Sequence, residues 1–203
     1  MSFFTLLITF ILLNVICDLN YFVRTLFCVL TGRIYQCNNT LKDVTTIYGM
    51  CTFQNCDVTF KNIRIAKLVR ELDFARYHFY DRTGIYQRSQ KFRIKSLQGC
   101  TLIITSEPVP MFQTYKINTK LVYWDDRSLF LEHEVVTLRD GKVRHLLVSR
   151  QHAIGPNGNS IAILLKDLVG SESKPSCPDY ITHWLHSMEL SSLRLRNAHH
   201  MQN

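Results

Sequence analysis

Several side chains of this sequence could bind a metal or attack a carbonyl group, but they are scattered along it. The seven cysteines include no Cys-x-x-Cys pair, and Cys56 would need a histidine partner to act as a nucleophile. His133 and His145 lie on segments that we expect to be neighbouring strands, without a third ligand nearby. His199 and His200 stand in a polar tail. We therefore expect reduced, partly buried cysteines, no bound metal and no cofactor.

Two carboxylates lie on either side of the start of a predicted helix. A carboxylate in such a place can activate water or attack a carbonyl carbon. Each also has a structural interpretation, since Asp57 could shape a turn and Asp73 could pair with Arg70 or Arg76. A further polar cluster, residues 124 to 127, could line a ligand channel or form a turn whose Asp side chains bind the backbone.

The clearest element of the sequence is a helix over residues 63 to 81. Apolar side chains recur in it mostly at spacings of three and four. Thr83-Gly84 supplies a stop signal, and Lys67 and Glu71 lie four residues apart on what we expect to be the wetter side. The apolar residues are Ile65, Leu68, Val69, Leu72, Phe79 and Tyr80.

The segments around this helix are typical of strands. A short β-prone segment at 48–60 precedes the helix, and Asp140-Gly141 is a hairpin turn signal. Strands are predicted at 101–105, 115–124, 129–138 and 143–154, and helical segments at 161–168 and 178–196. This order predicts an α+β fold in which an antiparallel sheet wraps one long central helix, with a hydrophobic helix before it and a C-terminal helix after it.

The N-terminus carries an apolar run over residues 3 to 17, which fits the core of a signal sequence and is short for a membrane span. Three interpretations are open: an uncleaved anchor, cleavage after Cys17 that releases a secreted protein, or a buried helix. Because Arg24, Arg33 and Lys42 follow the run, we favour an anchor in the endoplasmic reticulum membrane with the domain on the cytosolic side. The glycosylation sequon at 38–40 would be used only in the lumen.

The composition is that of an ordinary globular protein, with 46% hydrophobic and 20% charged residues, so extensive disorder is not expected. The net charge of +8 comes from scattered Lys and Arg residues without a run of five. Binding to nucleic acid is therefore not expected, whereas a membrane surface or a phosphate-bearing ligand such as CoA is compatible with the charge. We divide the chain into a hydrophobic anchor and connector at 1–45, a central domain at 46–156, and a C-terminal extension with a helix at 157–203.

Short motifs with a recognisable pattern are spread over the whole chain. They are Arg70–Arg76, Tyr123–Arg127, Leu138–Gly141, Arg150–His152, and His183-Trp184 with Ser191-Ser192. Together they resemble the thioesterase superfamily member six group, whose domain is similar to the 4-hydroxybenzoyl-CoA thioesterases. The resemblance implies a hot-dog fold behind an N-terminal membrane segment, association with the endoplasmic reticulum or the secretory route, and a homodimer. It also implies an acyl-CoA or related acyl thioester as the ligand, in a pocket at the dimer interface.

The same resemblance implies an Asp-x-Asp-x-x-x-His-x-Asn-Asn segment just before the helix. In such a segment a carboxylate acts on the thioester, and donors at the helix N-terminus stabilise the oxyanion. Aligned on Arg70–Arg76, the signature positions fall on Cys56, Val58, Asn62, Arg64 and Ile65. Every signature side chain is therefore replaced, unless a shift by one residue brings Asp57 into an Asp position.

The candidate site follows from this alignment. The catalytic candidates are Asp57 and Asp73, and the substrate-binding candidates are Asn62, Arg64 and Trp124. The replaced signature favours a hot-dog protein that binds acyl-CoA-type ligands at a membrane without catalysis. The alternative is an active acyl-CoA thioesterase that hydrolyses fatty acyl thioesters with one of the two carboxylates as the base. A secreted structural protein would require cleavage of the signal segment.

Overall fold

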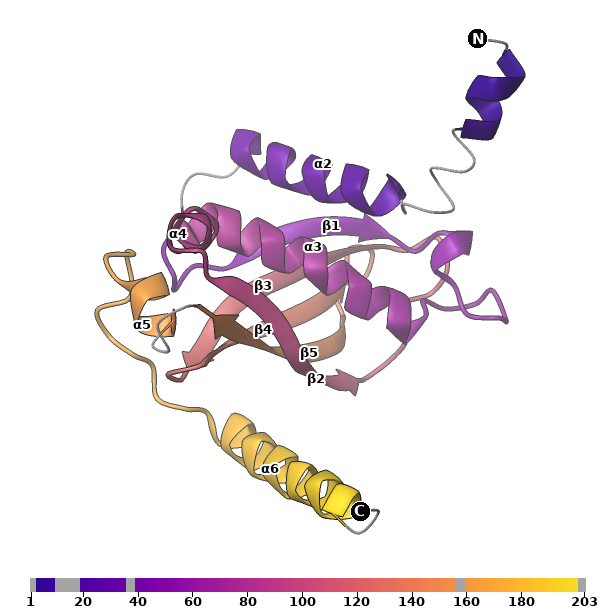
Figure 1. The fold of residues 1–203 in the computed structure, drawn as a ribbon. Coiled ribbons are helices and arrows are strands. Elements are labelled where there is room, and N and C mark those ends of the chain that lie inside the picture. The colour runs from indigo at the N-terminus through magenta and orange to yellow at the C-terminus, as the bar shows by residue number, and fades with distance from the viewer. Residues whose placement is uncertain (1–2, 10–18, 36–38, 156–159, 201–203) are drawn as a thin grey trace.

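A computed structural model describes residues 3–9, 19–35, 39–155 and 160–200 of the chain (Figure 1). The helices are residues 3–9, α2 (Leu19–Tyr35), α3 (Ile65–Thr83), α4 (Ile85–Phe92), α5 (Ser160–Leu165) and α6 (Asp179–His200), with a 3-10 turn η1 (Phe53–Asn55). The strands are β1 (Thr45–Met50), β2 (Lys95–Thr105), β3 (Thr114–Trp124), β4 (Ser128–Thr137) and β5 (Val143–Ile154).

The five strands form one antiparallel sheet in the order β1-β3-β4-β5-β2. The sheet curls around α3, while α2 runs alongside α3 and α6 lies on the opposite side of the sheet (Figure 1). The two strands next to the α3 connection, β1 and β2, are the two edges of the sheet. The expected hot-dog arrangement, one long helix wrapped by an antiparallel sheet, is therefore confirmed.

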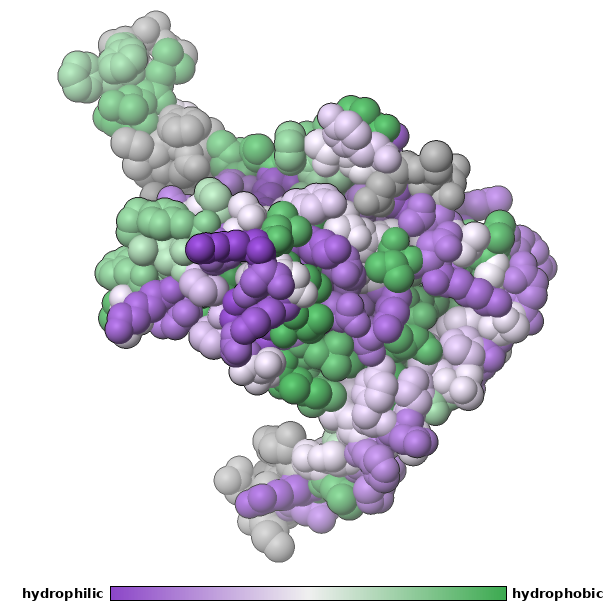
Figure 2. Space-filling view, turned by 180° about the vertical axis from the view of Figure 1, so that it is seen from behind, coloured by the Kyte–Doolittle hydropathy of each residue, from purple (hydrophilic) through white to green (hydrophobic). Residues whose placement is uncertain are grey.

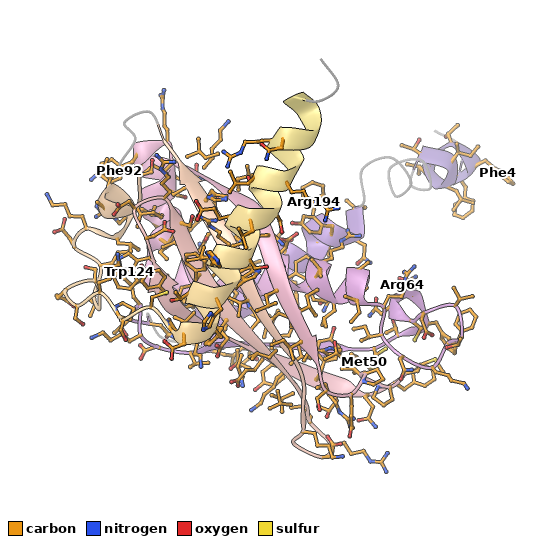
Figure 3. All side chains as sticks on the ribbon, turned by 90° about the horizontal axis from the view of Figure 1, so that it is seen from below. Phe4, Met50, Arg64, Phe92, Trp124 and Arg194 are labelled. Carbon is orange, nitrogen blue, oxygen red and sulfur yellow. The ribbon has the colours of Figure 1, made fainter. Side chains whose placement is uncertain are left out.

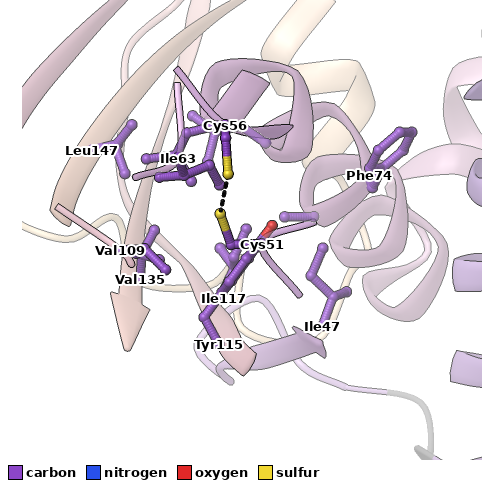
Figure 4. Packing of buried hydrophobic residues seen from close by; sticks show 13 residues of the cluster. Ile47, Cys51, Cys56, Ile63, Phe74, Val109, Tyr115, Ile117, Val135 and Leu147 are labelled. Carbon is purple, nitrogen blue, oxygen red and sulfur yellow. Dashed lines mark hydrogen bonds between the residues drawn. The ribbon is translucent and has the colours of Figure 1, made fainter. Parts of the chain in front are cut away.

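The main core lies between α3 and the inner face of the sheet (Figure 4). Leu68 and Leu72 on α3 are buried together with Ile117 on β3 and Val135 on β4. Ile117 and Val135 are register partners, so their side chains stand on the same face of the sheet. The three- and four-residue spacing on the helix and the two-residue spacing on the strands thus meet in one apolar layer.

The helix begins and ends two residues later than the sequence predicts. It ends where Gly84 adopts a left-handed conformation with φ +83°, which a residue without Cβ adopts at little cost. One expectation about its surface is wrong: Glu71 does not lie on a wet side but is 0% exposed. The reason is that α2, a separate segment of the chain, covers this side of α3 and brings Arg24 to the carboxylate.

Two elements between α3 and β3 were not predicted in full. Helix α4 has a mostly polar sequence, and only Ile85 in it is buried. Strand β2 begins at Lys95, six residues before the predicted start, and its pairing with β5 shifts between Gln98 and Cys100. At this irregularity Gly99 packs against His152, where a Cβ would lie 2.4 Å from the imidazole Nε2.

Helix α6 packs its first turns onto the outer face of the sheet. Ile181 is buried against Phe130 and Val148, and the Trp184 ring meets the Phe130 ring at a centroid distance of 6.4 Å. The Tyr180 hydroxyl donates to Glu132 at 2.5 Å, which joins α6 to β4.

Within the described ranges, none of the helices is both long enough and apolar enough to cross a bilayer. The predicted cleavage position after Cys17 lies outside the described residues, as does Asn38, the first residue of the sequon.

Candidate functional site

The loop before α3 holds Asp57 as a turn residue. Its carboxylate accepts a hydrogen bond from the Thr59 hydroxyl at 2.8 Å and from the Lys61 backbone N–H at 3.3 Å. The Thr59 bond, helped by the backbone donors, lowers the pKa of Asp57 below its usual value. The ionised carboxylate of Asp57 therefore stabilises the turn of its own loop, which agrees with the structural interpretation of this residue.

Asn62 and Arg64 connect the same loop to its surroundings. The Asn62 carbonyl accepts the Asp57 N–H at 2.8 Å, and Asn62 forms an isolated bridge with Pro110. Arg64 is the N-cap residue of α3, and its guanidinium donates to the Gln54 carbonyl at 3.0 Å. Both side chains therefore lie near the helix start, where the resemblance places the oxyanion donors.

Asp73 lies nine residues beyond Arg64, which is about 13 Å along the helix axis. Its carboxylate pairs with Arg76, one turn on, at 2.9 Å. Arg76 also donates to Gln98 at 3.2 Å and to Gln151 at 2.8 Å, on the adjacent strands β2 and β5. The ion pair anticipated for Asp73 is therefore present.

Trp124 is at the opposite end of the domain from Arg64 (Figure 3). It lines a small hollow of about 310 Å³ with Asp125, Asp126 and residues of α5. The Asp125 carboxylate accepts the Arg127 and Ser128 backbone N–H groups at 2.8 and 2.6 Å, so these residues form the expected turn. Within one copy of the chain, the five candidate residues thus fall into three separate places.

A groove of about 610 Å³ lies between α2, β1, η1 and α3. This volume is in the range of small-molecule sites. Apolar side chains of α2 and β1 line it, namely Phe27, Ile47, Tyr48 and Met50, whereas Arg24 and Lys67 supply positive charge. None of the five candidate residues lines this groove.

A buried ion pair lies beside the groove. Arg24 on α2 contacts the Glu71 carboxylate, and its guanidinium also lies 5.0 Å from the centre of the Phe74 ring. Burial raises the pKa of Glu71, and the charge of Arg24 opposes that rise. In the described part of the chain, neither carboxylate oxygen accepts a hydrogen bond, so the Arg24 charge is the main compensation for this buried anion.

We did not predict this pair from the sequence, because its partners are 47 positions apart and Lys67 lies nearer to Glu71 along the chain. Tyr115 lies at the same place, and its buried hydroxyl has a raised pKa through loss of solvent. A signal was present in retrospect: Arg24 interrupts an otherwise apolar run, and an isolated charge in such a run usually has a partner.

The two histidines that could have formed a metal site do not share one. His133 is fully buried and hydrogen-bonded to Thr119 and Ser149, each at 3.0 Å, while His145 contacts Thr105 on the other edge of β5. Burial lowers the pKa of His133 to about 3, so it is neutral at physiological pH. Among the residues described, no three His, Cys, Asp or Glu side chains are grouped so that they could hold a metal ion.

Comparisons with known proteins agree with the fold. The family model of the thioesterase-like superfamily matches residues 51–185. Protein THEM6 of Drosophila melanogaster is 40% identical over 190 residues, which cover 94% of this chain and 97% of that protein. Protein THEM6 of Xenopus laevis is 30% identical over 181 residues, which cover 88% of this chain and 85% of that protein.

Solved structures resemble the domain in fold alone. A 1,4-dihydroxy-2-naphthoyl-CoA thioesterase from Synechocystis gives a TM-score of 0.51 at 6% identity, over 62% of this chain and 98% of that one. The 4-hydroxybenzoyl CoA thioesterase from Pseudomonas gives 0.50 at 15% identity, over 59% and 98%. By the sheet wrapped around α3, the matched family model and the relatives similar over nearly their whole length, this chain belongs to the thioesterase-like superfamily, in the group of proteins related to THEM6.

Proposed function

We propose that this chain is a non-catalytic hot-dog protein that binds an acyl-CoA-type thioester at the endoplasmic reticulum membrane. The observation that carries the proposal is the engagement of both candidate carboxylates. Asp57 is bound within its own turn and Asp73 is paired with Arg76. A general base must reach the proton that it removes, and neither carboxylate lines the groove of about 610 Å³.

The groove under α2 supports an amphiphilic ligand. Its apolar wall suits an acyl chain, whereas Arg24 and Lys67 suit an anionic or strongly polar group. Both basic side chains line the groove, so both lie within reach of the charged part of a ligand. The proposal thus places the acyl part along Tyr48 and Met50 and the charged part toward the start of α3.

The proposal includes a homodimer and an N-terminal membrane segment. Strand β2 is an edge of the sheet, and an edge strand offers unpaired backbone groups to a second copy. Leu97 and Ile104 on this strand are exposed, which favours their burial in an assembly. The apolar residues 3–9 are exposed as well and supply the membrane contact.

A binding and turnover experiment tests the proposal. The full chain, purified in detergent, is titrated with a non-hydrolysable thioether analogue of a long-chain acyl-CoA, and hydrolysis of the natural thioester is measured in parallel. Met50→Glu places a negative charge in the groove and should weaken analogue binding at least tenfold, which corresponds to about 1.4 kcal/mol. Val58→Glu is the matched control, because Val58 is exposed and outside the groove.

Two outcomes would contradict the proposal. One is robust hydrolysis that disappears in Asp57→Asn or Asp73→Asn, because the chain would then be an active acyl-CoA thioesterase. The other is analogue binding that Met50→Glu and Val58→Glu weaken equally, because the ligand would then lie elsewhere.

A further inference from the structure

Helix α2 is inverted in polarity relative to an ordinary surface helix. A helix on a water-exposed surface turns its apolar side toward the protein and its charges toward solvent. On α2 the large apolar side chains are between 47% and 75% exposed. They are Phe22, Val23, Leu26, Phe27, Leu30 and Ile34, which we call the outer stripe. The side chains along the two edges of this stripe also line hollows beside the domain, since Phe27 lines the groove and Phe22, Leu26 and Leu30 line a second hollow of about 360 Å³.

The charged side chains of α2 point the other way, toward α3. Arg24 contacts the buried Glu71, and Arg33 makes two hydrogen bonds to Asp81, at 3.1 and 2.6 Å. The small residue Gly32 lies against His78, where an added Cβ would be only 2.2 Å from the imidazole Cε1. Gly32, the residue of α2 that would let another segment approach closely, is therefore already in contact with α3.

The two threonine hydroxyls of α2 are satisfied within the helix. The hydroxyls of Thr25 and Thr31 donate to the carbonyls of Tyr21 and Phe27, four residues earlier, each at 2.8 Å. Thr9, in the preceding helix, makes the same bond to Thr5 at 2.8 Å. Intrahelical satisfaction of hydroxyl groups is how Ser and Thr are accommodated where no water is available.

A second exposed apolar segment precedes α2 in the chain. Residues 3–9 include Phe3, Phe4, Leu6, Leu7 and Ile8, and each of these side chains is exposed. Figure 2 shows hydrophobic side chains along the upper edge of the molecule, where these residues and α2 lie. Soluble monomers rarely expose this many large apolar side chains close together on one helix, as α2 does.

We infer that the outer stripe of α2 is a lipid-binding surface that holds the domain flat against a bilayer. Because α2 packs along α3, the helix lies parallel to the domain surface, as an interfacial helix does. At 17 residues it is about 26 Å long, so it offers an extended contact rather than a point of attachment. A second copy of the chain fits the stripe less well, since the outer stripe carries only large side chains and Gly32 faces inward.

The inference builds on the membrane association in the proposed function, but it concerns α2 and not residues 3–17. An anchor alone would leave the domain free to tilt, and the far end of α2 would then be in water. Insertion along the whole outer stripe would place both ends of α2 at the same depth. Val23 and Ile34 are near the two ends of the helix. Neither lines the groove, and neither lines the hollow of about 360 Å³ that Tyr77 and Tyr86 form with the other side of α2.

Single tryptophan substitutions can measure this depth in the full chain. Val23→Trp, Ile34→Trp and the control Leu190→Trp are each reconstituted into phosphatidylcholine vesicles, with and without bromine on the acyl chains. Leu190 is exposed on α6, on the far side of the domain from α2 (Figure 1). Brominated acyl chains should quench most of the emission added at positions 23 and 34 and little of that added at position 190.

The outcomes separate this inference from the proposed function. If the protein floats with the vesicles but Ile34→Trp is quenched no more than Leu190→Trp, the inference is wrong while membrane association stands. If the emission of Ile34→Trp instead changes with the protein-to-lipid ratio and is not quenched, a second copy covers the stripe, and the inference is again overturned. Loss of quenching at position 34 on adding Leu26→Glu and Leu30→Glu would support it.

Discussion

Loss of Arg24 should destabilise the protein strongly, because Glu71 would remain as a buried and uncompensated carboxylate. Removing one partner of a buried ion pair costs about 3–5 kcal/mol. Glu71 has no exposed side-chain surface, but the side chain of Arg24 is 25% exposed, so we take the lower end, about 3 kcal/mol, for Arg24→Met. For a chain of this size, about 2–4 °C per kcal/mol then gives a fall in melting temperature of about 6–12 °C.

The loss should depend on pH in a defined direction. Burial raises the pKa of Glu71, and removal of Arg24 raises it further. A carboxyl group with a raised pKa in the folded state adds stability below its unfolded pKa of about 4.3, and this stability is lost as pH rises through the folded pKa. The fall in melting temperature caused by Arg24→Met should therefore be larger at pH 7 than at pH 5. Melting curves followed by near-ultraviolet circular dichroism measure it.

Two further variants test whether the buried pair of Arg24 and Glu71 holds α2 to α3. Glu71→Gln in the Arg24→Met background removes the stranded charge and should restore much of the stability at pH 7. Arg33→Met is the matched control on the same helix, since Asp81 keeps Arg82 at 2.6 Å and the ion pair of a half-exposed arginine adds little stability. If Arg24→Met were no less stable than Arg33→Met at pH 7, or if Glu71→Gln failed to rescue it, the buried pair would not be what holds α2 to α3.

Three more measurements follow from buried positions. Gly32→Val should cost about 1–3 kcal/mol in urea unfolding through its clash with His78, whereas Thr31→Ala beside it should cost less; equal losses would contradict the contact. Burial lowers the pKa of His133 to about 3, so below pH 6.5 the unfolded chain binds a proton that the folded chain does not. The free energy of unfolding should therefore fall by about 1.4 kcal/mol per pH unit between pH 6.5 and pH 3. His133→Gln should therefore flatten acid unfolding over that range, and an unchanged slope would refute this. Burial raises the pKa of Cys51 to about 12, so its alkylation by iodoacetamide at pH 8 should be far slower in the folded than in the unfolded chain.

The sequence could predict those strands whose own apolar side chains mark them. Residues 115–124 alternate because one side of the strand packs on α3, whereas residues 143–154 are mostly buried on both faces. The bounds of both strands were predicted to within a residue. The hairpin between β4 and β5 was also predictable, because a turn of this kind needs a residue that adopts a positive φ, and Gly141 does so with φ +67°. The contacts of both catalytic candidates were also predictable, because they are local in the sequence. Asp57 stabilises its own turn, and Asp73 pairs with a residue one helical turn away.

Elements held by distant contacts could not be predicted. Helix α4 has little apolar periodicity of its own, and Arg88 attaches it to the Ile163 carbonyl at 2.8 Å, 75 positions later. The first half of β2 has few apolar side chains, since its pairing with β5 rather than burial defines it. The burial of Glu71 depends on α2, which local spacing on α3 cannot reveal.

The position of Glu71 also bears on the lipid contact that we infer for α2. A buried carboxylate is tolerated only while Arg24 is beside it, so separation of α2 from α3 would carry a large free-energy cost. Helix α2 is therefore part of the folded domain and not a flexible connection to the hydrophobic residues before it. Since α2 also forms one wall of the groove, lipid bound to the outer stripe, as we infer, would orient the groove and the sheet around α3 together with the helix.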